Sequence, residues 1–379
     1  MQRSNSKSPP SELGVFWFLP TNRDGRSLSI DVGGREPDSS YLKQVALAAD
    51  SLGYEGVLVP TGNSCEDPWI VSAVAASVTE RLKFLIAVRP GTVSPTVAAR
   101  MAATLDRATR GRVLVNVVTG ADPVENAADG LFLDHAERYR QLDEWVNVFN
   151  KLLDGERVSH AGEFVRIEQA QLSFPPQVRP QTYFGGSSQT SYELGAHLFD
   201  TFLTWGEPPE QVAQKIKTVR ALAEAADRHV SFGLRIHVVV RRTAHEAWAA
   251  ANRLIEDLSD EELAAAQQTI SRSQSIGQRH MVALHGGRRD NLEISPNLWA
   301  GIGLARGGNG TALVGDPQTV AARLREYQSL GISTFILSGY PHLEEAHRVA
   351  ELLFPELGIN AQESVQAKGT RKYGEAIVD

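Results

Sequence analysis

Short runs of β-branched and aromatic residues alternate with longer amphipathic stretches along most of this chain of 379 residues. The runs are nearly continuous in apolarity, as expected of parallel strands that are buried on both faces. The alternation therefore predicts eight parallel strands, most of them followed by helical sequence. The predicted strands are Gly14–Pro20, Gly56–Thr61, Lys83–Gly91, Arg112–Gly120, Gln181–Gly186, Thr201–Gly206, Ser231–Val240 and Thr334–Pro341.

The stretches between the runs have helical periodicity, for example YLKQVALAADSLG, SPTVAARMAATLDRATRG and PPEQVAQKIKTVRALAEAADR. Proline at the front and glycine at the end frame several of them, as is typical of helix boundaries. Eight strands alternating with helices predict an α/β fold, a (β/α)8 TIM barrel with insertions. An open, doubly wound sheet is the alternative.

We interpret residues 14–358 as a single barrel domain with two insertions. Residues 158–176 read as a small hairpin, and residues 271–310 form a long, polar, glycine-rich stretch of the kind that often serves as a mobile lid. Residues 1–13 are rich in serine and proline and predict a disordered leader, and residues 359–379 predict a tail.

Arg235 and His237 interrupt the apolar run Leu234–Val240. Side chains alternate along a strand, so these two side chains share one face. On a barrel strand neither face is in water, and both groups need partners. An anionic ligand would supply one; the alternative is a structural pair that protein groups satisfy.

Polar and aromatic residues recur at the C-terminal ends of the predicted strands, where barrel enzymes carry their active sites. GGSS at Gly185–Ser188 opens a helix, so it predicts either a phosphate site or simply a serine N-cap. Tyr340 lies at a predicted strand end, where its hydroxyl would transfer a proton or its ring would simply pack as an aromatic side chain. Arg306 belongs to a glycine-rich loop and either covers the anion or is solvated. The remaining strand-end candidates are Asn22, Cys65, Arg89, Asn116, Thr119, Trp205 and His342.

The composition narrows the possible functions. A net charge of -7 argues against nucleic acid as a partner. Cys65 is the only cysteine, which fits a reducing compartment, and we find neither a signal peptide nor an apolar run long enough for a membrane helix. We therefore expect a cytoplasmic protein. The sequence has no P-loop, no HExxH motif and no dinucleotide fingerprint, and we expect no metal site.

Long blocks of the sequence resemble the alkanesulfonate monooxygenases, two-component flavin enzymes of the bacterial-luciferase-like superfamily. The resemblance runs from about Val15 to Phe354. The blocks include FWFLPT, VLVPTGNSCEDPW, RPGTVSPTVAARMAATLDR, NVVTGADP, LDHAERY, FGGSS, LTWGEPPE, RRDNLEISPNLWAGIGLARGGNGTALVGDP and SGYPHLEEAHRVAELLFP.

The resemblance implies an FMNH2- and O2-dependent monooxygenase that cleaves the C–S bond of an organosulfonate and releases sulfite and an aldehyde. It implies that FMN binds in its reduced form as a dissociable cosubstrate and that a separate NAD(P)H-dependent flavin reductase supplies it. A homo-oligomer, either a dimer or a tetramer, is implied as well, in which the C-terminal tail docks near a neighbouring subunit's site. The chain would contact neither nucleic acid nor a membrane.

The resemblance also assigns roles to residues. Arg306, His237, Tyr340 and Cys65 would be catalytic. The sulfonate would lie among Trp205, Arg235, His237, Arg306, Tyr340 and His342. Ser187 and Ser188, together with Gly186 and Tyr139, would hold the FMN phosphate, and Asn116 would face the flavin ring. The stretch 271–310 matches the family's mobile lid, which would exclude water from the reacting flavin.

Two loops depart from the pattern typical of alkanesulfonate enzymes. The chain has TNRDGRSLS where these relatives read THGDGHYLG, and TGNSCED where they read TGRSCED. Asn22 and Asn63 therefore stand in loops where a substrate tail would lie, and amide groups suit a hydroxylated tail better than an alkyl chain. We expect a polar sulfosugar such as sulfoquinovose, with a linear alkanesulfonate or methanesulfonate as the alternative. More distant alternatives are a deazaflavin-dependent oxidoreductase and a non-catalytic flavin-binding protein.

Overall fold

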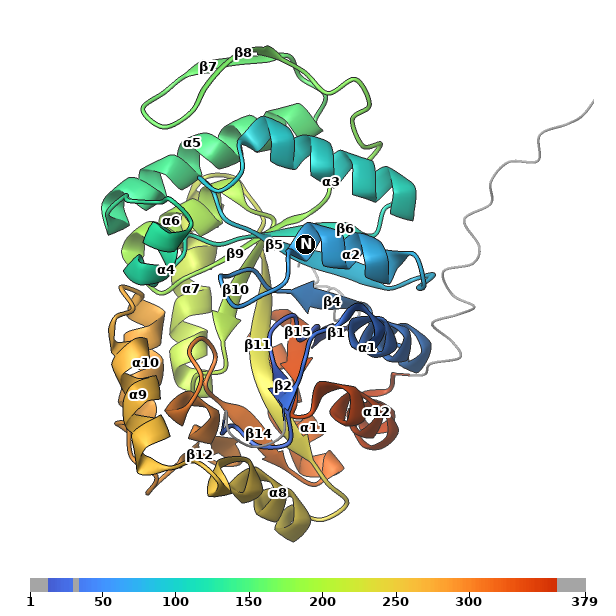
Figure 1. Ribbon diagram of the computed structural model, residues 1–379, viewed down its shortest axis with the longest axis vertical. Helices are drawn as coiled ribbons and strands as arrows, with labels where there is room; N and C mark the ends of the chain where they lie inside the picture. Colours follow the sequence, from blue (N-terminus) through green and yellow to red (C-terminus); the bar gives the residue numbers. More distant parts are fainter. Residues whose placement is uncertain (1–12, 30–33, 360–379) are drawn as a thin grey trace, which may run out of the picture.

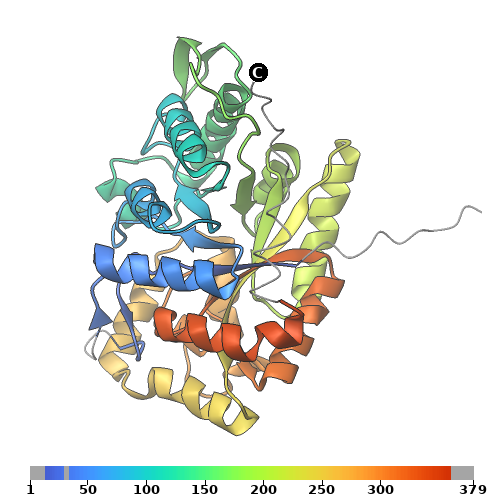
Figure 2. The ribbon, with the colours of Figure 1, turned by 90° about the vertical axis from the view of Figure 1, so that its right-hand side faces the viewer.

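The computed structural model describes residues 13–29 and 34–359 (Figures 1 and 2). Nearly all of the predicted leader and of the predicted tail lies outside these residues. Within them, the eight predicted strands are all present, with ends that differ by at most three residues. They are β1 Gly14–Phe18, β4 Gly56–Val59, β5 Lys83–Val88, β6 Val113–Val117, β9 Thr182–Gly185, β10 Thr201–Trp205, β11 Ser231–Val240 and β15 Ile332–Ser338.

These strands form a closed parallel barrel in the order β10-β9-β6-β5-β4-β1-β15-β11. Residues Thr201–Trp205 of β10 pair with Ser231–Arg235 of β11 and close the ring. The predicted (β/α)8 barrel is therefore confirmed, and the open sheet is excluded because an open sheet has two unpaired edges. Closure brings the C-terminal ends of the strands to one rim.

Helices surround the barrel, as Figure 1 shows. Most begin at a capping side chain or at proline: Asp38, Ser94, Asp134 and Ser188 each accept a hydrogen bond from the first turn. The helices are α1 Ser39–Leu52, α2 Pro68–Ala76, α3 Pro95–Thr109, α4 Pro123–Ala128, α5 His135–Leu153, α6 Gln189–Leu198, α7 Pro209–Ala225, α8 Ala244–Glu256, α9 Asp260–Ser271, α10 Ile276–His285, α11 Pro317–Ser329, α12 His342–Leu352 and α13 Phe354–Leu357.

Three segments interrupt the regular alternation. β2 Asp24–Gly25 and β3 Gly34–Arg35 pair after the first strand. The predicted hairpin is formed by β7 Val158–Ala161 and β8 Arg166–Ala170, which project beyond the helices at the top of Figure 1. The third segment lies between β11 and α11. It contains α8 to α10, β12 Glu293–Ser295, β13 Leu298–Trp299, the 3-10 helix η1 Gly301–Leu304 and β14 Ala312–Gly315.

The stretch 271–310 is therefore built from regular elements and is not one irregular loop. α10, η1 and two short strands lie within it. The sequence prediction missed these elements because they are short and glycine punctuates the whole stretch. The structure does not test whether the stretch moves, so its role as a lid stays a prediction.

Alternation along the strands separates two apolar layers. Phe16, Phe18, Leu85, Leu114 and Ile336 belong to one buried cluster that several neighbouring barrel strands build. The residues between them belong to a second, larger cluster that also includes helix residues. The first cluster therefore fills the barrel interior, and the second lies between the barrel and its helices.

The two apolar layers show on which side of the barrel wall the two polar residues of β11 lie. Leu234, Ile236 and Val238 belong to the outer cluster, between the barrel and its helices. Arg235 and His237 alternate with them, so their side chains point into the barrel. The sequence pattern had predicted the shared face, and barrel closure makes that face an interior one.

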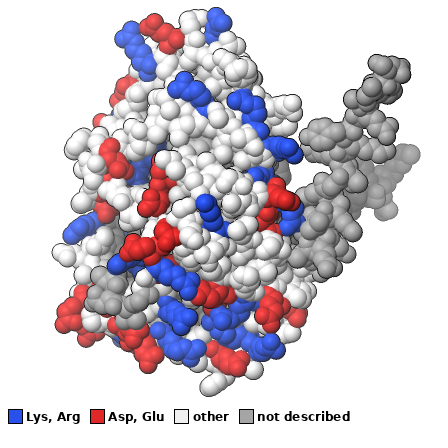
Figure 3. Space-filling view, turned by 45° about the vertical axis from the view of Figure 1, so that its right-hand side comes forward, with Lys and Arg blue, Asp and Glu red and all other residues white. Residues whose placement is uncertain are grey.

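Charged side chains of both signs lie interspersed on the face drawn in Figure 3. This distribution agrees with the modest net charge of -7. Across residues 13–29 and 34–359, no helix combines the length and the apolarity that a membrane span requires.

We predict that Phe335→Ala destabilises the protein by about 3–5 kcal/mol, because Phe335 on β15 is 0% exposed and its loss leaves a cavity. Phe132→Ala is the matched control: Phe132 is 82% exposed and should change the free energy of unfolding by less than about 0.5 kcal/mol. Urea unfolding measures both. Equal effects of the two substitutions would contradict the assignment of Phe335 to the core.

Candidate active site

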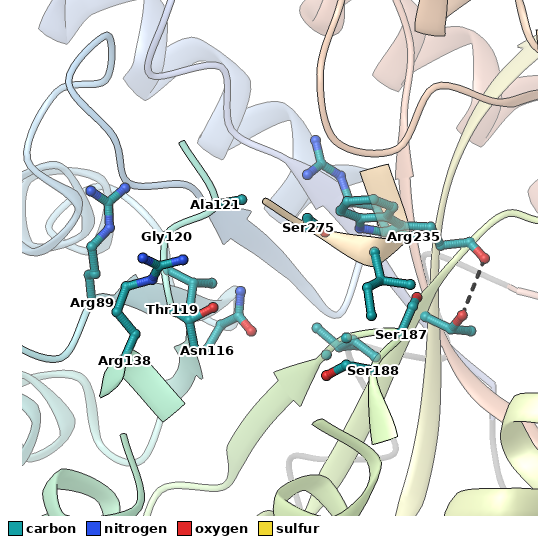
Figure 4. Close-up of a pocket in the computed structure, with 18 of the residues that line it drawn as sticks. Arg89, Asn116, Thr119, Gly120, Ala121, Arg138, Ser187, Ser188, Arg235 and Ser275 are labelled. Carbon is teal, nitrogen blue, oxygen red and sulfur yellow. Dashed lines mark hydrogen bonds between the residues drawn. The ribbon is translucent and has the colours of Figure 1, made fainter. Parts of the chain in front are cut away.

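A cavity of about 320 Å³ opens at the rim formed by the C-terminal strand ends (Figure 4). This volume lies within the range of small-molecule sites. Figure 4 shows Arg89 and Arg138 on one side of the cavity and Ser187, Ser188 and Arg235 on the other. Among the residues predicted from the sequence, the lining includes Arg89, Asn116, Thr119, Tyr139, Gly186, Ser187, Ser188, Trp205 and Arg235.

The loop between β9 and α6 forms the hydroxyl-rich part of the wall. Ser188 is the N-cap of α6, and its hydroxyl accepts from the Ser191 backbone N–H at 3.1 Å. Gly186 sits so close to Ser191 that a Cβ atom would overlap that side chain. The N-terminus of α6 therefore lies at the cavity wall, an arrangement suited to a phosphate.

A second helix begins at the same cavity. Ser275, Ile276 and Gly277 line it, and Ser275 caps α10 by accepting from the Gln278 N–H at 3.2 Å. α10 belongs to the segment predicted to be a lid. The N-termini of α6 and α10 therefore lie at one cavity, and both favour a negative charge there.

Arg138 adds a buried positive charge that the sequence analysis did not single out. It is 4% exposed and donates to Leu133 O at 2.9 Å and to Gln274 Oε1 at 2.7 Å. Its Nε atom has no partner, and no carboxylate in the described part of the chain forms an ion pair with it. Burial lowers the pKa of Arg138, a shift that an anion in the cavity would oppose. Arg138 precedes Tyr139 in the HAERY motif, and this motif is the signal in the sequence that points to it.

Arg235 lies at the other end of the cavity. Its guanidinium is 4.5 Å from the centre of the Phe18 ring, and its Nε atom is buried without a partner. Burial lowers its pKa, and the nearby Tyr340 and Cys65 oppose that shift. Arg235 is thus a half-buried cation on the interior face of β11 that forms no ion pair with a carboxylate of the described residues, an arrangement suited to binding an anion.

His237 behaves differently from its neighbour on β11. Its Nε2 lies 3.2 Å from Asn309 O, and its Nδ1 lies 2.8 Å from Ser338 Oγ. Because the carbonyl can only accept, Nε2 carries the proton and Nδ1 accepts from the serine. Burial, followed by the charges of Arg235 and His342, lowers the pKa of His237 well below its ordinary value. His237 is therefore neutral and bonded at both nitrogens, and a direct contact with an anion would require one of these bonds to break.

Tyr340, Arg306 and Cys65 gather near Arg235. Burial raises the pKa of Tyr340, while the guanidinium of Arg306 beside its hydroxyl opposes the rise. The Tyr340 ring stacks on His237 with centroids 5.5 Å apart. Burial also raises the pKa of the Cys65 thiol, so this cysteine is protonated at neutral pH and is not an activated thiolate.

His342 is held by a carboxylate that the sequence analysis missed. Asp24 lies 2.8 Å from His342 Nδ1, accepts from the His342 backbone N–H at 2.9 Å, and also accepts from the Tyr41 hydroxyl. His342 Nε2 is buried without a partner. Burial alone raises the pKa of Asp24, but the charge and hydrogen bonds of His342 and the bond from Tyr41 outweigh it, so that pKa lies below 3.8. Asp24 belongs to the RDGR turn, and no spacing in the sequence linked it to His342.

The structure does not bring the two variant loop residues into the cavity wall. Asn22 is half-buried, and neither it nor Asn63 is among the lining residues. Asn63 is exposed, and its backbone N–H donates to Glu125 Oε1 at 3.1 Å. Glu125 in turn pairs with Arg89 at 2.8 Å, so Asn63 lies one residue behind the lining. Contact of Asn22 or Asn63 with a substrate stays a prediction.

Comparison with known proteins identifies the family. The family model described as luciferase-like monooxygenase matches residues 14–334. A riboflavin lyase, whose structure holds modified FMN and riboflavin, aligns with a TM-score of 0.77 at 20% identity and covers 92% of each chain. A long-chain alkane monooxygenase aligns with a TM-score of 0.75 at 19% identity, covering 95% of this chain and 96% of that one.

A further similar structure is that of an enzyme that depends on a cofactor other than FMN. It is the coenzyme F420-dependent tetrahydromethanopterin reductase from Methanopyrus kandleri, with a TM-score of 0.68, 16% identity, and coverage of 92% of this chain and all of that one (100%). At such low identities, these structural similarities establish the fold and leave the substrate open.

We predict that Asp24→Asn lowers the free energy of unfolding at pH 7 by about 2–4 kcal/mol, because it removes the buried charge that faces His342. A carboxyl whose folded-state pKa is depressed adds stability above its unfolded value and loses it as the pH falls through the folded-state pKa. The difference between wild type and variant should therefore be full at pH 7 and shrink below pH 3.8.

Urea unfolding at several pH values measures this difference. Asp290→Asn is the matched control, since the Arg288–Asp290 pair is exposed and should contribute little. A difference for Asp24→Asn that does not change with pH would contradict the ion-pair interpretation.

Proposed function

The chain belongs to the luciferase-like monooxygenase family, and from this premise we propose that it is an FMNH2- and O2-dependent monooxygenase that cleaves the C–S bond of an organosulfonate. In this reaction one oxygen atom of O2 replaces the sulfonate on carbon and the other leaves as water, so that an aldehyde and sulfite are formed. The observation that carries the proposal is a pair of arginines at the cavity, the buried Arg138 and the half-buried Arg235, whose buried Nε atoms have no partner and which form no ion pair with a carboxylate of the described residues.

The residues that line the cavity fit a flavin mononucleotide. Ser187, Ser188 and Tyr139 border the start of α6, where a phosphate would accept hydrogen bonds, and Asn116 would face the ring. Bound in reduced form, the flavin would supply the electrons that activate O2. We propose that a separate NAD(P)H-dependent flavin reductase provides it, and that the chain works in the cytoplasm as a dimer or tetramer.

Arg235 would bind the sulfonate, because its forked donors remain charged in a site with no carboxylate of its own. Arg306 would contact the same anion from the glycine-rich loop, together with Tyr340 and Trp205. His342 offers the unpartnered Nε2, and Asp24 fixes which way its ring points.

His237 would act on the loop that carries Arg306. Its Nε2 bonds Asn309, and Gly206 and Thr311 bond the same short segment: the Gly206 N–H donates to Asn309 Oδ1 at 2.9 Å, and the Thr311 hydroxyl donates to Gly206 O at 2.6 Å. Gln278 of α10 accepts from the Gly308 N–H at 2.7 Å. The loop therefore connects β10, β11 and the start of the proposed lid, which would close over the substrate and exclude water.

The favoured substrate is a polar sulfosugar such as sulfoquinovose, since the two variant loops carry Asn22 and Asn63. We predict sulfite release from sulfoquinovose in the presence of FMN, NADH, a flavin reductase and air. Methanesulfonate and octanesulfonate, assayed side by side, represent the alternative substrates. A clear preference for octanesulfonate would contradict the sugar assignment and leave the desulfonating activity standing.

The same assay without O2 tests the second candidate, a deazaflavin-dependent oxidoreductase, which the likeness to an F420-dependent reductase favours. The proposed monooxygenase should show no turnover without O2. Anaerobic turnover with reduced F420 would establish the alternative. The absence of turnover with every sulfonate and either cofactor would exclude sulfonates as substrates and contradict the proposed desulfonation.

We predict that Arg235→Ala and Arg306→Ala each lower kcat/KM for sulfite release by about a hundredfold or more, since each removes a charged donor to the sulfonate. FMN binding by Arg235→Ala should stay within about twofold of wild type. Arg242→Ala, which removes an exposed arginine two residues beyond β11, should leave both quantities unchanged. A fully active Arg306→Ala enzyme would refute the role of the loop.

A further inference from the structure

A buried ion pair lies directly behind the hydroxyl-rich wall of the cavity. Lys215 on α7 and Glu207 after β10 are 7% and 0% exposed, and Lys215 Nζ is 2.5 Å from Glu207 Oε2. Lys215 Nζ also donates to Ser187 Oγ at 2.8 Å. Neither residue lines the cavity, so the pair reaches a ligand only through Ser187.

The bond from Lys215 decides what the Ser187 hydroxyl can do. A serine hydroxyl has one proton to donate, and its oxygen can accept. Because Lys215 occupies an acceptor position, the hydroxyl proton of Ser187 remains available for an oxyanion in the cavity. Ser188 differs, since its hydroxyl serves as the cap of α6.

The ion pair also touches the proposed lid. His280 Nδ1 on α10 lies 3.7 Å from Glu207 Oε1. Gly277, in the first turn of α10, approaches Ser187 so closely that a Cβ atom there would lie 3.1 Å from its hydroxyl oxygen. Glu207 thus lies between the lysine behind Ser187 and the helix that covers it.

We propose that Lys215 is a positioning residue for the flavin phosphate, which it serves by holding the Ser187 hydroxyl in the orientation that donates to the phosphate. Glu207 balances the lysine charge and keeps it fixed at this place. The burial of Lys215 lowers its pKa, and the Glu207 carboxylate opposes the shift. This inference rests on the proposed function, because it takes FMN as the ligand.

FMN and riboflavin differ only by the phosphate, so the ratio of their dissociation constants isolates the contribution of the phosphate site. Anaerobic titration of the full chain with each reduced flavin, followed by tryptophan fluorescence, gives the ratio for wild type, Lys215→Met and Lys217→Met. We expect Lys215→Met to raise the Kd for FMN about tenfold and to change that for riboflavin less than about twofold. Lys217 is exposed on the same helix, and Lys217→Met should change neither value.

A double-mutant cycle tests whether Lys215 affects the phosphate through the Ser187 hydroxyl. Ser187→Ala should also weaken FMN binding selectively, and Lys215→Met should have little further effect in that background, because the two residues act on the phosphate as one unit. Fully additive effects, or an equal loss of FMN and riboflavin binding in Lys215→Met, would overturn the proposal.

Circular dichroism shows whether Lys215→Met is folded. If it is not, Lys215→Arg and Ser187→Ala decide: the arginine variant should keep the FMN preference of the wild type, and the alanine variant should lose it. The opposite pattern would overturn the role of Lys215. A wild-type chain that binds neither flavin contradicts the proposed function itself, an outcome distinct from all of these.

Discussion

The closure of the barrel between β10 and β11 is the constraint on which the site depends. If one face of the sheet were exposed, the polar face of β11 would lie in water, where an arginine and a histidine need no explanation. Closure turns that face inward, which buries His237 and partly buries Arg235. The protein then satisfies the two groups in opposite ways: His237 is neutral and bonded at both nitrogens, whereas Arg235 stays charged and lacks a carboxylate among its described neighbours.

The sequence predicted the barrel well because its strands carry a strong and repeated signal. All eight runs became strands, since continuous β-branched sequence bounded by glycine or proline has few other folds. The stretch 271–310 was harder to predict. Its helix α10 and short strands are stabilised by tertiary contacts, such as the bond from Gly308 to Gln278, and not by a long amphipathic pattern.

The same difference separates the site residues that the sequence predicted from those that it did not. Strand ends and a helix N-terminus have positions that the fold class dictates, so Asn116, Ser187, Trp205 and Arg235 were found at the cavity. Asp24 and Lys215 do not line the cavity but contact residues of the site. Asp24 contacts His342, which is 318 positions away, and Lys215 contacts Ser187, which is 28 positions away. No periodicity or motif relates residues so far apart in the chain, and only the folded structure brings them into contact.

The placement of carboxylates completes the electrostatic argument. A site meant for a phosphate and a sulfonate needs positive potential, and yet buried cations without any counter-charge destabilise a fold. Asp24 and Glu207, which are 2% and 0% exposed, resolve this conflict by position. Asp24 contacts His342 and Glu207 contacts Lys215, and neither carboxylate is among the residues that line the cavity, so each compensates charge in the fold without adding an acceptor to the cavity wall. Arg138 and Arg235 line the cavity and form no ion pair with a carboxylate of the described residues, so an anionic ligand would complete the balance of charge there.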